Sequence, residues 1–209
     1  MATPEMIAAI LSGSLMGLAA GEISRALAVR NRPPGRPDPL SWLLAGIGAV
    51  ALATHPGVRS GPLPATAEAA LITLLLLIVA CDVRERAVYP AIVYPGVVLP
   101  VIAAPLLGTS AVDALLGAAT STGLFAAFYV VGHLRYGPGA LGSGDVLVAA
   151  VLGGVAGLSG LSLALILVGV FAAGIASIVG LRARSLRATF PYTPALCLAA
   201  LAATLLRAP

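Results

Sequence analysis

The chain has 209 residues, of which 59% are hydrophobic and only 10% are charged, and its net charge is +4. A soluble domain carries about 25% charged residues, so this chain has too few to cover a surface that faces water. All twelve basic residues are arginines in short segments between apolar runs, which argues against a nucleic-acid partner. We therefore expect one membrane-embedded domain, residues 1–209, with the lipid bilayer as its main solvent.

Eight apolar runs follow one another along the chain, and each is a candidate for a membrane-spanning helix. They are Met6–Val29, Leu40–Thr54, Pro64–Cys81, Ala91–Leu107, Ala111–Leu134, Val146–Leu158, Leu161–Leu181 and Phe190–Leu206. The segment from 146 to 181 is too long for one crossing, and its Gly-Leu-Ser-Gly sequence at 157–160 predicts a hairpin. The fold class is thus an all-α polytopic membrane bundle of about eight transmembrane helices, or seven if the short second run is re-entrant.

The arginines predict how this bundle is oriented. If the N-terminus lies outside, ten of the twelve arginines fall in cytoplasmic segments, and only Arg59 and Arg207 fall on the other side. This distribution fits the rule that positive charge is retained on the cytoplasmic side.

Two patterns concern packing and surface charge. Gly13, Gly17 and Gly21 recur every four residues, which indicates close contact with another helix of the same chain, or alternatively a dimer interface. The sequence leaves the oligomeric state open. Glu22 is placed to pair with Arg25 three residues later on the same helix. Glu68 and Asp113 open spans on the outer side, where we expect them to face solvent.

Two aspartates stand apart from the other acidic residues. Asp82 ends the third apolar run and Asp145 opens the sixth, 63 residues later. The topology derived from the arginines places both at the same depth on the cytoplasmic side. Taken singly, Asp82 is explained as a helix-end charge that reaches water, and Asp145 as a helix N-cap. Taken together, two ionisable groups at one membrane boundary are candidates for a functional site.

A close pair of carboxylates can hydrolyse a peptide bond. Two neighbouring carboxyl groups do not both ionise easily, so one retains its proton. The ionised group takes a proton from water as the water attacks the carbonyl, and the protonated group donates to the carbonyl oxygen. This chemistry requires no metal or cofactor, and we expect neither, because the two cysteines form no C-x-x-C or His/Cys cluster.

At these residues the chain resembles the type IV prepilin peptidases, a family of GxGD-type aspartyl membrane proteases. An apolar span ends in Asp82 and is followed by a basic stretch at 83–86 and by Pro90. A Gly-Ser-Gly-Asp-Val motif follows at 142–146. The last span opens with Pro-Tyr-Thr-Pro at 191–194, where the family often has Pro-Phe-Gly-Pro. The resemblance covers residues 64–206.

The resemblance implies an endopeptidase that removes the basic leader peptide of prepilins or pseudopilins at the cytoplasmic face of the plasma (inner) membrane. The sequence leaves open whether it serves type IV pili, secretion, DNA uptake or motility. The resemblance implies that Asp82 and Asp145 are catalytic. It further implies that the residues around the two motifs shape the site or bind substrate: Gly142, Ser143, Gly144, Pro191 and Pro194. Long members of the family carry paired C-x-x-C motifs linked to methyl transfer. Here the corresponding loop is the short segment 31–39, so we expect no methyltransferase activity.

Three alternatives stay open at this point. A presenilin-like or signal-peptide-peptidase-like protease also uses G-x-G-D, and Pro-Ala-Leu at 194–196 resembles a late motif of those enzymes. A proton-coupled transporter would use membrane aspartates as ion sites. A non-catalytic membrane scaffold is favoured by two departures from the family pattern, Leu147 in place of Lys and Tyr192 in place of Phe.

Overall fold

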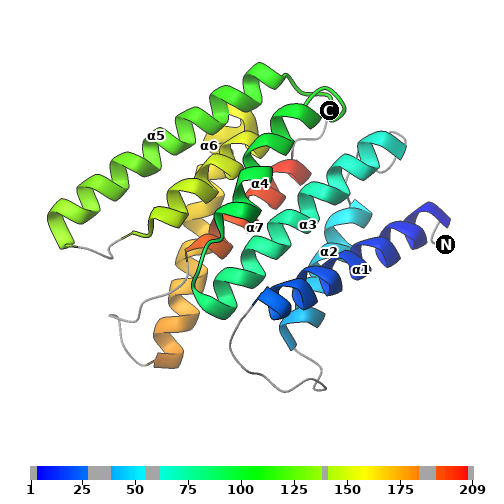
Figure 1. Cartoon of the computed structure of the whole chain (residues 1–209), viewed down its shortest axis with the longest axis horizontal. Coiled ribbons are helices and arrows are strands. Elements are labelled where there is room, and N and C mark those ends of the chain that lie inside the picture. The colour runs from blue at the N-terminus through cyan, green and yellow to red at the C-terminus, as the bar shows by residue number, and fades with distance from the viewer. Residues whose placement is uncertain (1–3, 28–38, 55–61, 138–140, 184–191, 207–209) are drawn as a thin grey trace.

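The computed structural model describes residues 4–27, 39–54, 62–137, 141–183 and 192–206, and all its regular structure in these ranges is helical (Figure 1). The helices are α1 (Pro4–Leu27), α2 (Pro39–Thr54), α3 (Pro62–Glu85), α4 (Pro90–Ala103), α5 (Ala111–Tyr136), α6 (Ser143–Ala183) and α7 (Thr193–Leu206). The all-α prediction is therefore confirmed.

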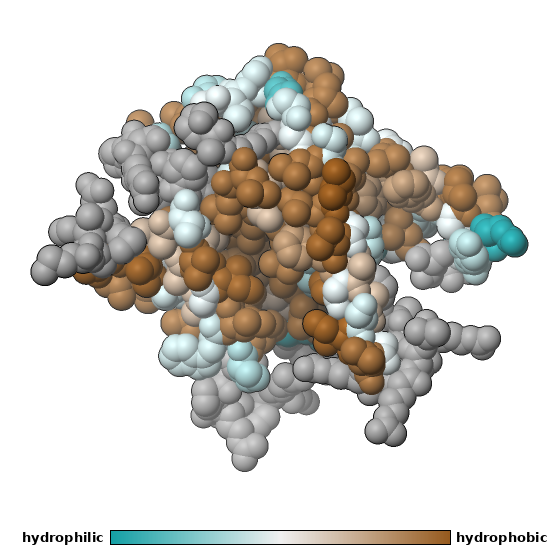
Figure 2. Space-filling model, turned by 180° about the vertical axis from the view of Figure 1, so that it is seen from behind, coloured by the Kyte–Doolittle hydropathy of each residue, from teal (hydrophilic) through white to brown (hydrophobic). Residues whose placement is uncertain are grey.

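The surface of the bundle supports a membrane environment. Four helices contain segments long and apolar enough to cross a membrane, and α2, α4 and α7 are shorter apolar helices. Large apolar side chains are exposed along α5 and the second half of α6, among them Val112, Leu115, Val131, Ile166 and Val170. Figure 2 shows apolar residues over most of the face opposite to the view of Figure 1. Burial of these groups against lipid replaces the burial that a soluble protein would need.

Helix α6 is interrupted where the sequence predicted a hairpin. Gly157 has φ 60 and ψ 171, which is a non-helical conformation open chiefly to glycine. The chain turns back at this residue, so α6 consists of two arms that run in opposite directions (Figure 1). Asp113 of α5 accepts hydrogen bonds from the Ser159 backbone N–H at 3.1 Å and from its hydroxyl at 2.9 Å. A carboxylate from one helix thus caps the start of the second arm.

Glycines allow two pairs of helices to pack backbone against backbone. A Cβ atom added at Gly13, Gly17 or Gly21 of α1 would overlap Gly48, Leu44 or Ser41 of α2, respectively. Between α5 and α6, a Cβ on Gly117 would overlap Gly153 and Gly157. The glycine repeat of the first helix therefore packs within the chain, as the first of the two sequence interpretations held.

Helix α3 lies at the centre of the bundle and contacts α1, α2, α4 and α7. This position explains one wrong prediction. Glu68, in the second turn of α3, was expected to face solvent, but it is only 4% exposed because neighbouring helices cover it. The predicted pairing of Glu22 with Arg25 on α1 is confirmed, with a nitrogen–oxygen distance of 3.1 Å.

The elements that carry the two aspartates meet at one end of the bundle. The C-terminal ends of α1, α3 and α5 lie at this end, and α6 begins there as well (Figure 1). Arg25, Arg84 and Arg135 stand in the last turns of α1, α3 and α5. The positively charged helix ends therefore gather on the side of the molecule that holds Asp82 and Asp145.

Candidate active site

Asp82 lies in the last turn of α3 and is only 7% exposed. The helix continues for three residues beyond it and ends where Arg86 adopts a left-handed conformation, φ 52. The Arg86 N–H closes the helix by donating to the Asp82 carbonyl at 2.8 Å. A left-handed non-glycine residue costs about 1–2 kcal/mol, so the chain turns here against its local preference. The interpretation of Asp82 as a charge that reaches water is wrong, because the surrounding helices bury it.

Asp145 is the third residue of α6, which begins at Ser143, three residues earlier than the N-cap interpretation required. Its carboxylate accepts a hydrogen bond at 3.1 Å from the backbone N–H of Gly142, the residue just before the helix. This contact is the acidic half of a capping box, in which the third helical residue reaches back to the N-cap position. Asp145 therefore supports the helix start through Oδ2, while Oδ1 points elsewhere.

The second oxygen of Asp145 is held by a residue from another helix. The hydroxyl of Thr193, at the start of α7, donates to Asp145 Oδ1 at 3.0 Å. Thr193 is 1% exposed. Both oxygens of this carboxylate are thus fixed by donors, one from the loop before α6 and one from α7.

Asp82 and Asp145 are neighbours in space. The two carboxyl groups interact electrostatically, and the Thr193 hydroxyl is close enough to Asp82 to interact with it too. In the part of the chain that the structure describes, Oδ2 of Asp82 has no hydrogen-bond partner, although it is buried. A buried carboxylate oxygen without a donor is costly. This arrangement suits an oxygen that receives a donor from a water molecule or a substrate.

Gly144 brings the segment after Asp82 onto the helix that carries Asp145. A Cβ atom at Gly144 would lie 2.7 Å from the Cβ of Val88 and 2.8 Å from its Cγ2, closer than carbon atoms approach. Val88 belongs to the connection between α3 and α4. The second glycine of the motif therefore provides the space in which the two aspartate-bearing segments dock.

A side-chain hydrogen bond also holds the connection between α3 and α4 at its α4 end. Tyr89, the residue before α4, donates a hydrogen bond from its hydroxyl to the Glu85 carboxylate at the end of α3. This hydrogen bond raises the pKa of the Tyr89 phenol above its ordinary value, and partial burial and the Glu85 charge add to the effect. Arg84 donates to Ser41 of α2 at 3.4 Å. The end of α3 is therefore linked to both α2 and α4.

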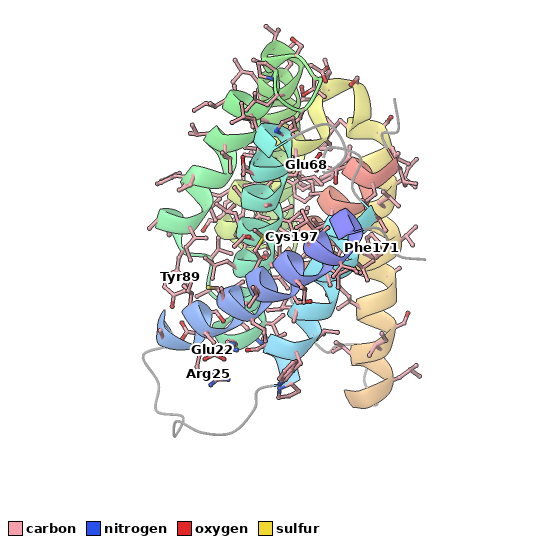
Figure 3. All side chains as sticks on the ribbon, turned by 90° about the vertical axis from the view of Figure 1, so that its right-hand side faces the viewer. Glu22, Arg25, Glu68, Tyr89, Phe171 and Cys197 are labelled. Carbon is pink, nitrogen blue, oxygen red and sulfur yellow. The ribbon has the colours of Figure 1, made fainter. Side chains whose placement is uncertain are left out.

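A thiol and aromatic side chains from several helices surround the two aspartates. Cys197 lies one turn after Thr193, is fully buried and interacts electrostatically with both aspartates. Figure 3 shows Cys197 in the interior, with Tyr89 nearer to the end where Glu22 and Arg25 lie. Tyr192 interacts electrostatically with Asp145, and its ring packs 6.1 Å from that of Phe125 on α5. Helices α3, α5, α6 and α7 therefore all reach the region of the two carboxylates.

The structure places the other predicted site residues as follows. Gly142 contacts Asp145 directly, and Gly144 receives Val88. Ser143 is exposed, and no hydrogen bond joins its side chain to either aspartate. Pro194 is buried in the first turn of α7. Pro191 lies outside the described residues.

Sequence reasoning missed the part played by Thr193, because it was noted only as a departure from the family's glycine. The signal that was available is the presence of a hydroxyl side chain at the start of the last span. Leu147, which replaces a lysine of the family pattern, packs against the hydrophobic core. Its side chain therefore contributes to the packing behind Asp145.

A family model described as the type IV leader peptidase family matches residues 69–178, a segment that contains both aspartates and the whole G-x-G-D motif. Searches of curated proteins and of solved structures found no match. The matched segment is more than half of the chain and includes most of α3, all of α4 and α5, and most of α6. The chain therefore belongs to the type IV leader peptidase family, which is a family of proteases.

Proposed function

We propose that this protein is a membrane aspartyl endopeptidase that removes the basic leader peptide of prepilin-like or pseudopilin-like proteins at the cytoplasmic membrane face. The observation that carries the proposal is the meeting of Asp82 and Asp145. These residues stand 63 positions apart in the sequence, on different helices, and their carboxyl groups interact in the folded chain. Membership of a leader peptidase family supplies the substrate class.

The chemistry follows from a carboxyl pair that shares one proton. The pair titrates as a unit, so the acid and base roles belong to both residues together. The ionised carboxylate removes a proton from water, and the oxygen of that water forms a bond to the scissile carbonyl carbon while the other carboxyl group protonates the carbonyl oxygen. When the C–N bond breaks, the proton taken from water passes to the leaving amine, and a hydroxyl proton of the intermediate returns to the other carboxyl group as the new carboxylic acid forms. Oδ2 of Asp82, which is buried and has no hydrogen-bond partner among the described residues, can accept a hydrogen bond from this water.

The location of the site supports a substrate that is itself anchored in the membrane. Both aspartates stand at the ends of apolar helices, on the side where the arginines of α1, α3 and α5 gather. Positive charge marks the cytoplasmic side. A leader that precedes a hydrophobic helix would present its cleavage site at this depth, with the helix in lipid and the leader in water.

The test is cleavage of a membrane protein with a basic leader, a glycine at the cleavage site and a following apolar helix. We expect the purified full chain to cut after that glycine, and Asp82→Asn and Asp145→Asn each to lose at least about 1,000-fold in rate, since each removes an acid–base group. Asp113→Asn is the matched control, because it makes the same change at the start of α5, far from the pair. Retention of cleavage in either of the first two variants would contradict the proposal, as would a folded parent protein that cuts no substrate of this kind.

A further inference from the structure

Thr193 connects the last described helix to the candidate active site. Its hydroxyl donates to Asp145 Oδ1 at 3.0 Å across 48 residues of sequence, and its side chain is 1% exposed. A threonine inside a helix often donates instead to the carbonyl of the preceding turn, as Thr204 does further along α7 with Leu201 at 2.7 Å. Thr193 is the first residue of its helix and has no preceding helical turn. Its hydroxyl is therefore directed to another element.

This hydrogen bond is the second of two that hold the Asp145 carboxylate. The Gly142 N–H holds Oδ2 and the Thr193 hydroxyl holds Oδ1. One donor fixes the position of a carboxyl group but still allows rotation about its Cβ–Cγ bond, whereas a donor on each oxygen fixes the plane as well. Threonine is suited to this role because its branched Cβ restricts χ1 and so directs the hydroxyl.

The two aspartates differ in the hydrogen bonds that their carboxyl groups accept. Asp145 has a donor on each oxygen, while Oδ2 of Asp82 has no partner within the described ranges. A catalytic pair functions when the two groups keep a fixed relative orientation around the water between them. The Pro-Phe-Gly-Pro pattern that this segment resembles has no side chain at the position of Thr193. The hydrogen bond between α6 and α7 at this site is thus made by a side chain that this pattern lacks.

We propose that Thr193 is a positioning residue, whose hydroxyl holds the plane of the Asp145 carboxylate in the orientation that peptide cleavage requires. The catalytic part of this inference rests on the proposed peptidase function. The structural part, that the hydroxyl holds the carboxylate, does not.

The experiment compares the full chain with Thr193→Val, which keeps the shape and removes the hydroxyl, and with Thr193→Ser, which keeps the hydroxyl. Thr204→Val is the matched control, because it removes a hydroxyl of α7 that binds only its own backbone. With a leader-bearing substrate, we expect Thr193→Val to lower kcat by about 10- to 100-fold with KM nearly unchanged, since a misplacement of about 1 Å costs about 100-fold. Thr193→Ser keeps the hydroxyl, and Thr204→Val removes one that bonds only to its own helix. Both variants should therefore keep kcat within about threefold of the parent value.

A spectroscopic readout separates this inference from the proposed function. The infrared difference between the parent and Asp145→Asn identifies the carboxylate band of Asp145. We expect that band to shift in Thr193→Val and to be unchanged in Thr193→Ser and Thr204→Val. If the parent cleaves nothing, the proposed function fails, while the band still decides whether Thr193 holds Asp145. The proposal for Thr193 is overturned if the band and kcat are unchanged in Thr193→Val, or if Thr193→Ser is as impaired as Thr193→Val.

Discussion

Substitution of Gly144 by alanine tests whether the docking of the connection after α3 sets the geometry of the site. The added Cβ would lie 2.7 Å from the Cβ of Val88, whereas carbon atoms rest at about 3.5–4.0 Å. The α3–α4 connection and the start of α6 must therefore separate by about 1 Å. A misplacement of this size is sufficient to lower a catalytic rate by about 100-fold.

The effect on stability should be small by comparison. Overpacking costs about 1–3 kcal/mol, while replacement of a helical glycine by alanine returns about 0.5–1 kcal/mol. The net loss in Gly144→Ala is then about 0–2.5 kcal/mol. We therefore expect a folded protein whose rate of leader cleavage falls much more than its thermal midpoint.

The control and the rescue come from the same helix and its partner. Gly154→Ala on α6 should be neutral or slightly stabilising, because its nearest neighbour would be a Pro100 carbon at an ordinary 3.5 Å. In the Gly144→Ala background, Val88→Gly removes every clashing atom, whereas Val88→Ala leaves the Cβ in place. In a double-mutant cycle on the cleavage rate, Val88→Gly should therefore restore much of the activity that Gly144→Ala loses, whereas Val88→Ala should restore little. Full activity in Gly144→Ala would refute the reasoning.

Two further predictions concern the ends of the bundle. Asp113→Ala removes the cap on Ser159 and should lower stability by about 0.5–2 kcal/mol, seen as a lower unfolding midpoint, with leader cleavage unchanged; a slower rate at an unchanged midpoint would contradict this. At the other end, the raised pKa of Tyr89 means that the folded chain keeps a proton that the unfolded chain loses near pH 10. The stabilisation from its bond to Glu85 is therefore present below about pH 10 and is lost as the pH rises through the folded pKa. In Glu85→Gln, NMR of labelled tyrosine should show Tyr89 titrating closer to its ordinary pKa, with Tyr89→Phe identifying the signal, and an unchanged titration would show that Glu85 is not the cause.

Much of the arrangement of the helices along the length of the bundle followed from the sequence. The lengths of the apolar runs located the helix ends to within a few residues, and the break at Gly157 fell where two glycines and a serine stand within four residues. Because each run reverses the direction of the chain, the order of the runs also indicated that Asp82 and Asp145 lie on one side. These features depend on hydropathy and on chain direction, which a sequence records directly.

The lateral arrangement of the helices did not follow from the sequence. Which helix faces which is set by the close contacts of glycines such as Gly117 and Gly144, and a glycine does not specify its partner. The contact between Thr193 and Asp145 could not be predicted for this reason. Glu68 was assigned to solvent by its place near a helix start, but burial depends on the neighbours of α3, which hydropathy does not reveal.

The short helices around the site have a consequence for the surrounding lipid. The first arm of α6, from Ser143 to Ala156, has fourteen residues, as do α4 and α7. At 1.5 Å per residue each is about 21 Å long, while the hydrocarbon layer of a bilayer is about 30 Å thick. The bilayer must therefore thin beside these helices, or their ends must lie below its surface. Where the bilayer thins, the water boundary moves to the level of the carboxylates, so the fold itself shortens the path that water must travel to reach them.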